Sequence, residues 1–452
     1  MADIVLVGGG LAGSLLSIYL AKRGFGVDVY ERRPDMRKES ISAGRSINLA
    51  LSTRGTHALK DVGLLEEIMK IAIPMKGRMI HAMSGELTFQ RYGRDDTEVI
   101  YATSRGRLNM TLLSAAERHP GVRVSFNQRC TGMDLDSGKL YLHDERSGMV
   151  QTVQGETVIG TDGSASALRM EMQKTGRFNL SQSHLEYGYK ELVIPGGPNG
   201  EFLLEKHALH IWPRTTYMLI ALPNIDGSFT CTLFFPFEGE LSFDTLQTPE
   251  QVGVFFTRQF SDAVSLMPTL LDDFFSNPTG SMVTIKCGPW HVEGKVALLG
   301  DAAHAIVPFF GQGMNCAFED CTVLDEIIGN RRPEAGNWRP EWGGIFREYE
   351  RKRKVNTDAI ADLAVENFVE MRDLVAQAKF QLKKKVEQAL QAKWPERFIP
   401  KYSMVTFHRI PYSTAMNRGR MQDRILEELS KGIERAEDVN WSKAEQLVRE
   451  LP

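Results

Sequence analysis

The chain has 452 residues, 42% of them hydrophobic and 25% charged, and its 54 basic and 57 acidic side chains leave a formal net charge of −3. This is the composition of a globular protein, and the length corresponds to two or three domains of about 150 residues each. The near-balance of charge gives no reason to expect nucleic acid as a partner.

Cysteine usage and the N-terminus indicate the cellular setting. The five cysteines are Cys130, Cys231, Cys287, Cys316 and Cys321. Because their number is odd and none forms a CxxC pair, neither a disulfide framework nor a metal site is expected, and a reducing compartment is favoured. The N-terminus lacks the basic segment of a signal peptide, and no stretch reaches the roughly 18 apolar residues of a membrane span. We therefore expect a soluble, cytoplasmic protein without a bound metal.

Apolar periodicity predicts a βαβ unit at the start of the chain. Residues 3–7 form a short apolar strand, residues 15–24 have helical spacing, and residues 27–31 form a second strand. A unit of this kind needs only about 30 residues and commonly opens a nucleotide-binding fold.

The loop between the first strand and the helix contains a GxGxxG pattern formed by Gly8, Gly10 and Gly13. The first glycine permits a tight turn, the second lets the backbone approach a pyrophosphate, and the third lets the helix pack closely on the strand. Glu31 ends the second strand, where a carboxylate would accept hydrogen bonds from ribose hydroxyls. The segment therefore predicts a dinucleotide site.

Beyond this unit, strand and helix patterns alternate up to about residue 340. We expect, in chain order, short strands within 76–103, a helix at 107–118, a β-meander within 122–160, a second sheet within 187–237 and a buried strand at 296–299. After residues 330–344, a plausible boundary, the apolar rhythm is helical from 345 to about 393.

Two further segments favour FAD over NAD. The first, residues 160–169, contains Asp162-Gly163, and the second contains Gly300-Asp301 and then Gly311 to Asn315. Asp301 at a strand end is placed to bind a second polyol chain, although a helix N-cap would explain this aspartate alone equally well. The glycines before Asn315 leave backbone N–H groups at the start of a helix, expected over 315–328, which suits an electron-rich flavin edge.

In order and spacing, these three segments resemble the motifs of the single-component FAD-dependent aromatic hydroxylases. Longer segments outside the shared core resemble the kynurenine 3-monooxygenases, namely residues 44–51, 209–213, 367–371 and 397–407. The resemblance extends from residue 3 to about residue 412. It implies an α/β fold with a Rossmann-like FAD-binding domain, a second, mostly antiparallel sheet that binds the substrate, and a C-terminal helical region.

We expect three domains. The FAD-binding domain is assigned to 1–175 and 285–335, with inserted strands near 76–103 that join the substrate sheet. The substrate-binding sheet domain is assigned to 176–284, and a helical domain that covers the active site to 336–452.

The resemblance also implies site residues. The positions expected to contact FAD are Gly8, Gly10, Ala12, Gly13, Tyr30, Glu31, Arg32, Arg33, Arg45, Ala50, Arg105, Cys130, Asp162, Asp301, Gly313, Met314 and Asn315. Those expected to hold the amino-acid end of kynurenine are Arg78, Tyr92, Asn367 and Tyr402, with Met371 on the same helix face as Asn367. Those expected to form an apolar wall around the ring are Leu209, Leu222, Phe234, Pro308 and Phe309.

Residue chemistry agrees with the substrate assignment. An arginine binds a carboxylate in a bidentate manner, and phenol hydroxyls can donate further hydrogen bonds to the same carboxylate. From residue type alone, however, Arg78 would be a surface charge. Asn367 would be a structural amide, and the apolar residues would be ordinary core.

The implied reaction is hydroxylation of L-kynurenine to 3-hydroxy-L-kynurenine with NADPH and O₂, through a flavin C4a-hydroperoxide, in tryptophan catabolism. Tightly but non-covalently bound FAD carries this chemistry, so we assign no catalytic side chain. His304 lies next to the flavin segment, but a structural histidine is the more frequent case. The apolar wall would keep water from the reactive oxygen.

Two alternatives stay open at this stage: a flavin hydroxylase of another aromatic acid, and a non-catalytic FAD-binding sensor. Animal members of the family continue into an apolar C-terminal membrane anchor, whereas this sequence ends at Pro452 after a polar stretch. It therefore resembles the soluble bacterial form. A dimer is the assembly we consider, although no sequence feature fixes it.

Overall fold

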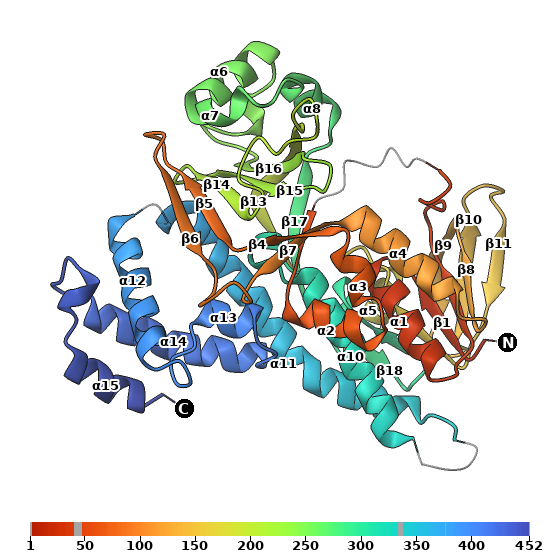
Figure 1. Ribbon diagram of the computed structural model, residues 1–452. Coiled ribbons are helices and arrows are strands. Elements are labelled where there is room, and N and C mark those ends of the chain that lie inside the picture. The colour runs from red at the N-terminus through yellow and green to blue at the C-terminus, as the bar shows by residue number, and fades with distance from the viewer. Residues whose placement is uncertain (1, 40–47, 333–337, 376, 452) are drawn as a thin grey trace. The chain divides into compact units, whose positions relative to one another are not determined.

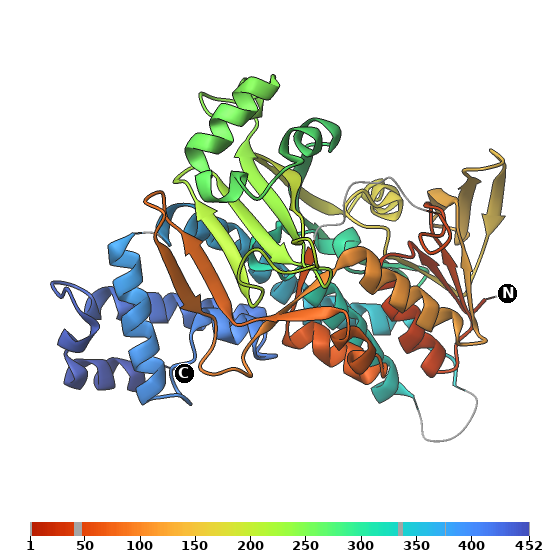
Figure 2. The same cartoon turned by 45° about the horizontal axis from the view of Figure 1, so that its top comes forward.

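The computed structural model describes residues 2–39, 48–332, 338–375 and 377–451 (Figures 1 and 2). The chain forms two compact units. The first comprises Met1–Ile71, Thr103–His184 and Val283–Ala361. The second comprises Ala72–Ala102, Leu185–Met282 and Asp362–Pro452.

The first unit contains a six-stranded sheet in the order β18-β19-β12-β1-β2-β8. Its strands are β1 (Ile4–Val7), β2 (Val27–Tyr30), β8 (Val122–Ser125), β12 (Thr157–Gly160), β18 (His291–Val292) and β19 (Val296–Leu298). Neighbouring strands run parallel, except that β18 is antiparallel to β19. Every residue of β1 and β12 is buried, as expected for strands covered on both faces of a parallel sheet.

The helices of the first unit follow the predicted order. They are α1 (Leu11–Lys22), α2 (Thr53–Asp61), α3 (Leu65–Met69), α4 (Arg105–Glu117), α5 (Ala167–Gln173), α9 (Asp301–His304), the 3-10 helix η2 (Pro308–Phe310) and α10 (Gly313–Arg331). Strand β3 (Asn48–Leu51) precedes α2. The helices expected near 15–24, 107–118 and 315–328 are therefore present as α1, α4 and α10.

The meander expected within 122–160 is divided between two sheets, which corrects the prediction. Only β9 (Gln128–Asp134), β10 (Lys139–Asp144) and β11 (Val150–Val153) form an antiparallel meander. Strands β8 and β12 instead join the parallel sheet. The reason is burial: β12 is buried at every position, whereas β11 has exposed residues and β10 alternates.

The second unit is built on a sheet in the order β17-β13-β16-β15-β14-β5-β6. Its strands are β5 (Gly77–His81), β6 (Leu87–Arg91), β13 (Asn179–Ile194), β14 (Ala208–Pro213), β15 (Met218–Pro223), β16 (Phe229–Pro236) and β17 (Gly280–Gly288). Strands β4 (Ala72–Met75) and β7 (Ile100–Ser104) flank the β5–β6 hairpin in sequence. The registered pairs are antiparallel except β14–β5, which is parallel.

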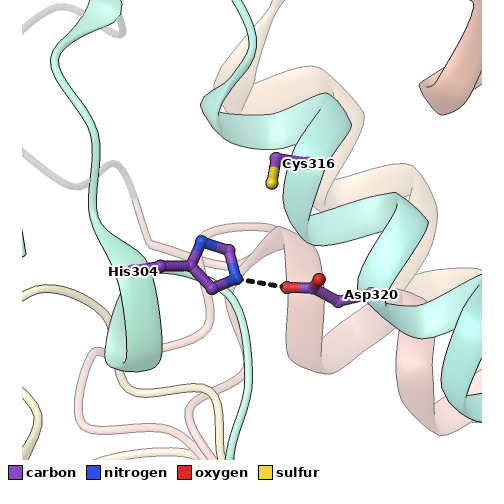
Figure 3. Close-up of side chains that lie close together, drawn as sticks. All are labelled: His304, Cys316 and Asp320. Carbon is purple, nitrogen blue, oxygen red and sulfur yellow. Dashed lines mark hydrogen bonds and ion pairs between the residues drawn. The ribbon is translucent and has the colours of Figure 1, made fainter. Parts of the chain in front are cut away.

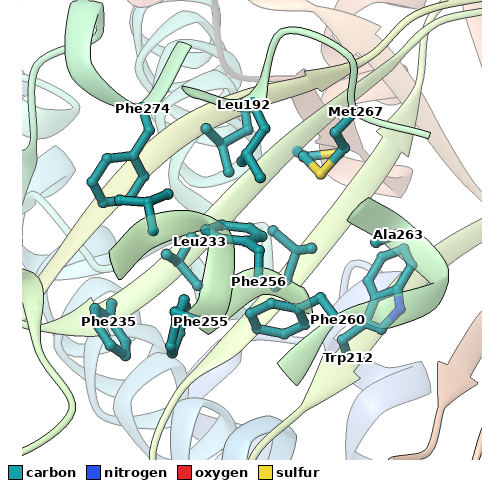
Figure 4. Packing of buried hydrophobic residues seen from close by; sticks show 14 of the residues in the cluster. Leu192, Trp212, Leu233, Phe235, Phe255, Phe256, Phe260, Ala263, Met267 and Phe274 are labelled. Carbon is teal, nitrogen blue, oxygen red and sulfur yellow. The ribbon is translucent and has the colours of Figure 1, made fainter. Parts of the chain in front are cut away.

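One face of this sheet is covered by α6 (Pro249–Gln259), α7 (Ser261–Val264) and α8 (Leu270–Ser276), which follow the 3-10 helix η1 (Phe243–Thr245). Leu192, Leu233 and Phe235 of the sheet pack there against Phe256 of α6 and against Phe260, the C-cap of α6 (Figure 4). Because side chains alternate along a strand, this core accounts for one residue in two, and the alternate residues face the opposite way.

The C-terminal region is helical but less regular than the sequence indicated. Helix α11 (Trp342–Val369) passes directly into a π-helix, η3 (Glu370–Leu374), in which Val375 N donates to Glu370 O at 3.1 Å. It is followed by α12 (Ala378–Lys393), α13 (Lys401–Thr406), α14 (Tyr412–Leu429), the 3-10 helix η4 (Ala436–Asp438) and α15 (Trp441–Arg449). The helical region expected from 345 to about 393 is therefore present, but the π-helix within it was not predicted, because no glycine or proline marks its position.

The predicted fold class is confirmed: a parallel α/β sheet, a second and mostly antiparallel sheet, and C-terminal helices. Val386, Leu390, Leu426 and Val448 belong to a separate small core of α12, α14 and α15. Within the described ranges, no helix combines the length and the apolar composition needed to cross a membrane.

A chain of polar contacts braces the helix-covered face of the second sheet. Asp262 Oδ2 lies 2.6 Å from His81 Nδ1, and His81 Nε2 lies 2.9 Å from His210 Nδ1. His210 Nε2 in turn lies 2.9 Å from Glu205 O. Glu205 O can only accept, so His210 donates from Nε2, and a neutral His210 then accepts from His81 Nε2 at its Nδ1. Burial, with His81 nearby, lowers the pKa of His210 to about 4.

This depressed pKa predicts that the second unit loses stability in acid. A neutral His210 contributes stability that is complete above the unfolded pKa near 6.5 and is lost as the pH falls toward 4. At pH 5 the loss is about 2 kcal/mol. Urea unfolding at pH 7.5 and pH 5.0 should show it in the parent, and His210→Gln should remove that part of the pH dependence. An equal pH dependence in both proteins would contradict the assignment.

Candidate cofactor and substrate sites

The predicted nucleotide-binding motifs meet at one edge of the parallel sheet. Gly8 follows β1, Glu31 follows β2, Asp162 follows β12, and Asp301 follows β19. These strands are neighbours and run parallel, so their carboxyl ends lie along the same edge. In open α/β sheets this edge is where ligands bind.

Two glycines of the loop, Gly10 and Gly13, have different surroundings. A Cβ atom at Gly13 would lie 2.0 Å from Gly8 O and 2.6 Å from Thr161 Oγ1, so this position packs the helix on the strands. A Cβ atom at Gly10 would meet no described atom within 4 Å. Gly10 is also the N-cap of α1 and has no side-chain cap. The backbone at Gly10 is therefore open to a phosphate at the positive end of a helix.

Glu31 is held rigidly as an ionised carboxylate. Its Oε2 accepts from Gly9 N at 2.8 Å, and its Oε1 accepts from Arg33 N and Nε at 2.9 and 2.8 Å. Although burial opposes ionisation, Arg33 and the Gly9 amide keep the pKa of Glu31 low. On the other side of the loop, Asn109 Nδ2 donates to Gly9 O at 3.3 Å. Sequence reasoning did not find Asn109, because a lone asparagine within a helix has no distinguishing signal.

Asp162 has a buried carboxylate oxygen that could accept a hydrogen bond from a ligand. Its Oδ2 accepts from Ala167 N at 2.8 Å, whereas its buried Oδ1 has no hydrogen-bond partner in the described part of the chain. Burial raises the pKa of this carboxyl group. The nearby Arg169, which was not predicted, donates to Ser164 O and, at 2.8 Å, to Ala302 O. Arg169 thus ties the segment after β12 to the segment after β19.

Asp301 is the exposed first residue of α9, and Gly300 is the N-cap. The alternative that Asp301 is merely an N-cap is therefore wrong. Asn315 has a structural task, because its Nδ2 donates to Ala50 O and Gly311 O, each at 2.8 Å, and its Oδ1 accepts from Ser52 N at 2.9 Å. Its side chain joins β3 to the start of α10, which leaves backbone N–H groups of the first helical turn as the part suited to a flavin.

The remaining residues predicted for FAD are placed as follows. Arg45 lies outside the described residues. Ala12 and Tyr30 are half-buried near the ends of the loop and β2, Arg32 and Arg105 are exposed, and Gly313 and Met314 begin α10. Cys130 lies on β9, where burial and then Asp162 raise the pKa of its thiol to about 12. That thiol is therefore uncharged at neutral pH.

In the second unit, the predicted substrate residues of the sheet share one face. Arg78 pairs with Leu209 in register, and Leu222 follows from the β14–β15 pairing. Phe234 lies on β16 with the same orientation. Since directly paired residues point the same way, all four project opposite to the core that α6 to α8 cover. Leu209, Leu222 and Phe234 are at most 9% exposed.

Arg78 lies beside a stacked pair of tyrosines. Its guanidinium carbon is 5.6 Å from the ring centre of Tyr92 and 5.3 Å from that of Tyr402, and the two rings stack at 5.3 Å. Arg78 is 7% exposed, and its buried Nε has no hydrogen-bond partner among the described residues. Burial raises the pKa of both tyrosines, so both phenols keep their protons as donors. An arginine with an unused buried donor beside two phenols is suited to a carboxylate.

The π-helix adds an acidic group that sequence reasoning missed. Glu370 Oε1 lies 3.7 Å from Arg78 Nη1. Burial opposes its charge, but Lys384, Arg78 and Lys401 hold the pKa of Glu370 below its usual range. The available signal was a carboxylate three residues after the predicted Asn367, hence on a neighbouring part of the same helix face.

Asn367 and Met371, both buried, are in contact, with Asn367 Nδ2 3.3 Å from Met371 Sδ. Arg372 anchors the same segment to the sheet, since its Nη1 donates to Tyr187 Oη at 2.8 Å. The π-helix therefore lies over the face of the sheet that carries Arg78. Pro308 and Phe309, also predicted for the apolar wall, belong to η2 of the first unit, where Pro308 is exposed and Phe309 buried.

Comparison with known proteins agrees with this geometry. The family described as FAD binding domain matches residues 1–189 and 277–340. The kynurenine 3-monooxygenase of Myxococcus xanthus is 55% identical over 99% of this chain and 94% of its own, and that of Dictyostelium discoideum is 48% identical over 99% and 97%. The kynurenine 3-monooxygenase of Stenotrophomonas maltophilia is 44% identical over 100% and 97%.

Solved structures share the fold. The tetrameric form of 2-methyl-3-hydroxypyridine-5-carboxylic acid oxygenase has a TM-score of 0.66 at 20% identity, over 83% of this chain and 94% of that chain. PqsL, a probable FAD-dependent monooxygenase from Pseudomonas aeruginosa, has a TM-score of 0.64 at 18% identity, over 82% and 97%. Fold, motifs and family match together define an FAD-dependent monooxygenase. More narrowly, the chain belongs to the kynurenine 3-monooxygenase family, as its motifs predicted.

Proposed function

We propose that the protein hydroxylates L-kynurenine to 3-hydroxy-L-kynurenine, using FAD, NADPH and O₂. The observation that carries this proposal is the pairing of Arg78 with Glu370 beside two phenols, on the sheet face that also carries Leu209, Leu222 and Phe234. A buried cation and a half-buried anion 3.7 Å apart are complementary to the carboxylate and the ammonium of an amino acid. The apolar residues of the same face suit an aromatic ring.

The residues at the edge of the parallel sheet fit FAD. Gly10 leaves room for a pyrophosphate, Glu31 has lone-pair capacity left for ribose hydroxyls, and Asp162 has an unsatisfied buried oxygen. Asp301 offers an exposed carboxylate at a strand end. FAD, once reduced by NADPH, supplies the activation of O₂ and the transfer of one oxygen atom.

The protein's own side chains bind the substrate, orient it and shield it from water. Arg78 pairs with the substrate carboxylate, to which the hydroxyls of Tyr92 and Tyr402 donate. Glu370 accepts from the ammonium, which fixes the amino-acid end. Leu209 and Leu222 lie on the same face as Arg78 and cover the ring, and they exclude water that would intercept reactive oxygen.

If Glu370 binds the α-ammonium group of the substrate, its replacement should weaken recognition of that group while largely sparing the chemical step. Glu370→Gln should raise the KM for L-kynurenine about 10- to 100-fold, the effect of losing roughly 1.5–3 kcal/mol from a charge-assisted hydrogen bond. Its kcat should change by no more than a few-fold. The variant should also lose most of the parent's preference for kynurenine over the analogue without the α-amino group, measured as the ratio of kcat/KM.

A matched control lies four residues earlier. Glu366 is half-exposed and pairs with Arg420 at 3.9 Å, so Glu366→Gln should leave KM and the preference for kynurenine unchanged. Equal kinetics in both variants would refute the role of Glu370 in binding the ammonium.

The proposed reaction is tested by NADPH consumption with L-kynurenine and by the mass of the product, which should increase by one oxygen atom. Turnover of a hydroxybenzoate but not of kynurenine would favour a related hydroxylase. A yellow protein that never accelerates NADPH oxidation would favour a sensor.

Location and assembly are further parts of the proposal. All five cysteines have free thiols, four of them buried, which supports a reducing compartment such as the cytoplasm. Assembly as a dimer stays a prediction, to be measured by light scattering of the purified protein.

A further inference from the structure

A buried polar cluster lies behind the turn that carries Asp301. It contains His304 at the end of α9 and Cys316 and Asp320 on α10, and Figure 3 shows His304 facing Asp320. One potential ligand atom from each of the three lies within 4.8 Å of the others, which is the spacing of a metal site. All three are nearly inaccessible to solvent, with exposures of 3%, 0% and 0%.

A guanidinium already provides the cation in this cluster. Arg353 Nε lies 2.6 Å from Asp320 Oδ1, and Arg353 Nη2 lies 3.3 Å from Cys316 Sγ. Glu319 Oε2 accepts from Arg353 Nη1 at 2.7 Å and from Arg54 Nε at 3.0 Å. Two carboxylates thus face two guanidiniums. A divalent ion would enter a buried cluster with no surplus negative charge, so the cluster needs another explanation.

The second carboxylate oxygen of Asp320, Oδ2, points to that explanation, because it contacts both ends of α9. Asp320 Oδ2 accepts from Gly300 N at 3.1 Å and lies 2.5 Å from His304 Nε2. Helix α9 has only four residues, and so short a helix does not hold itself together. Its N-cap, Gly300, has a φ of +65°, in the region that favours glycine. The conformation of this turn is therefore imposed by tertiary contacts, of which Asp320 supplies two.

We propose that Asp320 and His304 are positioning residues, which fix the Gly300–Asp301 turn in the conformation that binds FAD. The inference rests on the proposed role of Asp301 in holding that cofactor. Arg353 keeps the carboxylate of Asp320 charged and oriented, and His304 closes the turn from its far end. Asp301 stays exposed at the sheet edge because its neighbours on both sides are anchored beneath it.

Electrostatics support the arrangement. Although burial opposes charge on both groups, Asp320 raises the pKa of His304, while His304 and Arg353 lower the pKa of Asp320. The pair is therefore ionic and stays so through the neutral range. A charged hydrogen bond between buried groups is short and directional, which is what a positioning contact requires.

The test compares FAD dissociation from holoenzyme variants, measured by the fluorescence of flavin released on dilution. His304→Leu removes the donor, and we expect its FAD dissociation constant to rise at least tenfold. His304→Gln keeps a donor at about the same reach and should stay within threefold of the parent. Glu319→Gln disturbs the neighbouring ion pair of the same cluster without touching the turn, so it should lower the unfolding temperature yet also stay within threefold.

Asp320→Asn is the second variant should His304→Leu fail to fold, and its FAD dissociation constant should likewise rise at least tenfold. A purely structural cluster would give a different result: Glu319→Gln would weaken FAD binding as much as the turn variants, or none of the folded variants would weaken it. Either result, or one equivalent of zinc retained by the parent, overturns the proposal. A parent that binds no FAD would instead refute the proposed function.

Discussion

Replacing Arg78 with alanine should raise the KM for L-kynurenine by one to three powers of ten. Arg78 is 7% exposed and its guanidinium lies beside the stacked rings of Tyr92 and Tyr402, so a carboxylate bound there is withdrawn from water. Losing one member of such a charge pair costs about 2–5 kcal/mol of binding. FAD affinity should not change, because Arg78 is not among the residues that fit FAD.

The substitution should leave the fold intact. Glu370 would lose Arg78 but keep Lys384 and Lys401, the other two cations that hold its pKa low. Arg78→Lys keeps the charge but cannot form bidentate hydrogen bonds, so it should recover only part of the affinity for L-kynurenine. Arg91→Ala, on the paired strand, removes an arginine that is half-exposed and bound to Asp96, and it serves as the control. Unchanged steady-state kinetics in Arg78→Ala would refute the carboxylate assignment.

The two kinds of site differ in how far a sequence can predict them. The cofactor motifs are local: Gly8, Gly10 and Gly13 act within one turn, and Glu31 ends the next strand of the same unit. Parallel pairing then brings Asp162 and Asp301 to the same edge without further information. The substrate residues are not local. Arg78 is buried only because β5 pairs with β14, far along the chain, and from its residue type it would be expected in solvent.

Apart from Asn109, the residues that were missed are charged groups inside helices. Asp320 and Glu319 interrupt an otherwise apolar stretch of α10, and Glu370 follows a buried segment of α11. A charge at such a place must be paired, because an isolated buried charge is too costly. The sequence therefore indicates that partners exist. It cannot say that Arg353 is the partner of Asp320, because that contact joins two helices.

The interrupted C-terminal helix has a similar explanation. Nothing in the local sequence of Glu370–Leu374 disfavours an ordinary α-helix. In the structure, the Arg372 guanidinium lies over the rings of Tyr187 and Phe368, and Glu370 approaches Arg78. The wider turn of a π-helix allows successive side chains to reach these separate partners on the sheet, and such turns occur frequently at functional sites.

The second large effect concerns the glycine loop, where two alanine substitutions should fail for different reasons. Gly13→Ala would place a Cβ atom 2.0 Å from Gly8 O, within backbone that cannot move aside without separating α1 from the strands. Overpacking of this kind costs about 1–3 kcal/mol or more. We therefore expect Gly13→Ala to unfold at a lower temperature even when excess FAD is present.

Gly10→Ala should leave the stability of the FAD-free protein unchanged but weaken the binding of FAD. Its Cβ atom would meet no described protein atom within 4 Å, so the unfolding temperature of the FAD-free protein should match that of the parent. The added methyl group would occupy the space through which the pyrophosphate reaches the backbone, and we expect the FAD dissociation constant to rise about 100-fold or more, or about 2.7 kcal/mol. The two effects are separated by thermal unfolding with and without FAD, together with flavin release on dilution. If Gly10→Ala binds FAD as tightly as the parent, the pyrophosphate does not approach the backbone at Gly10.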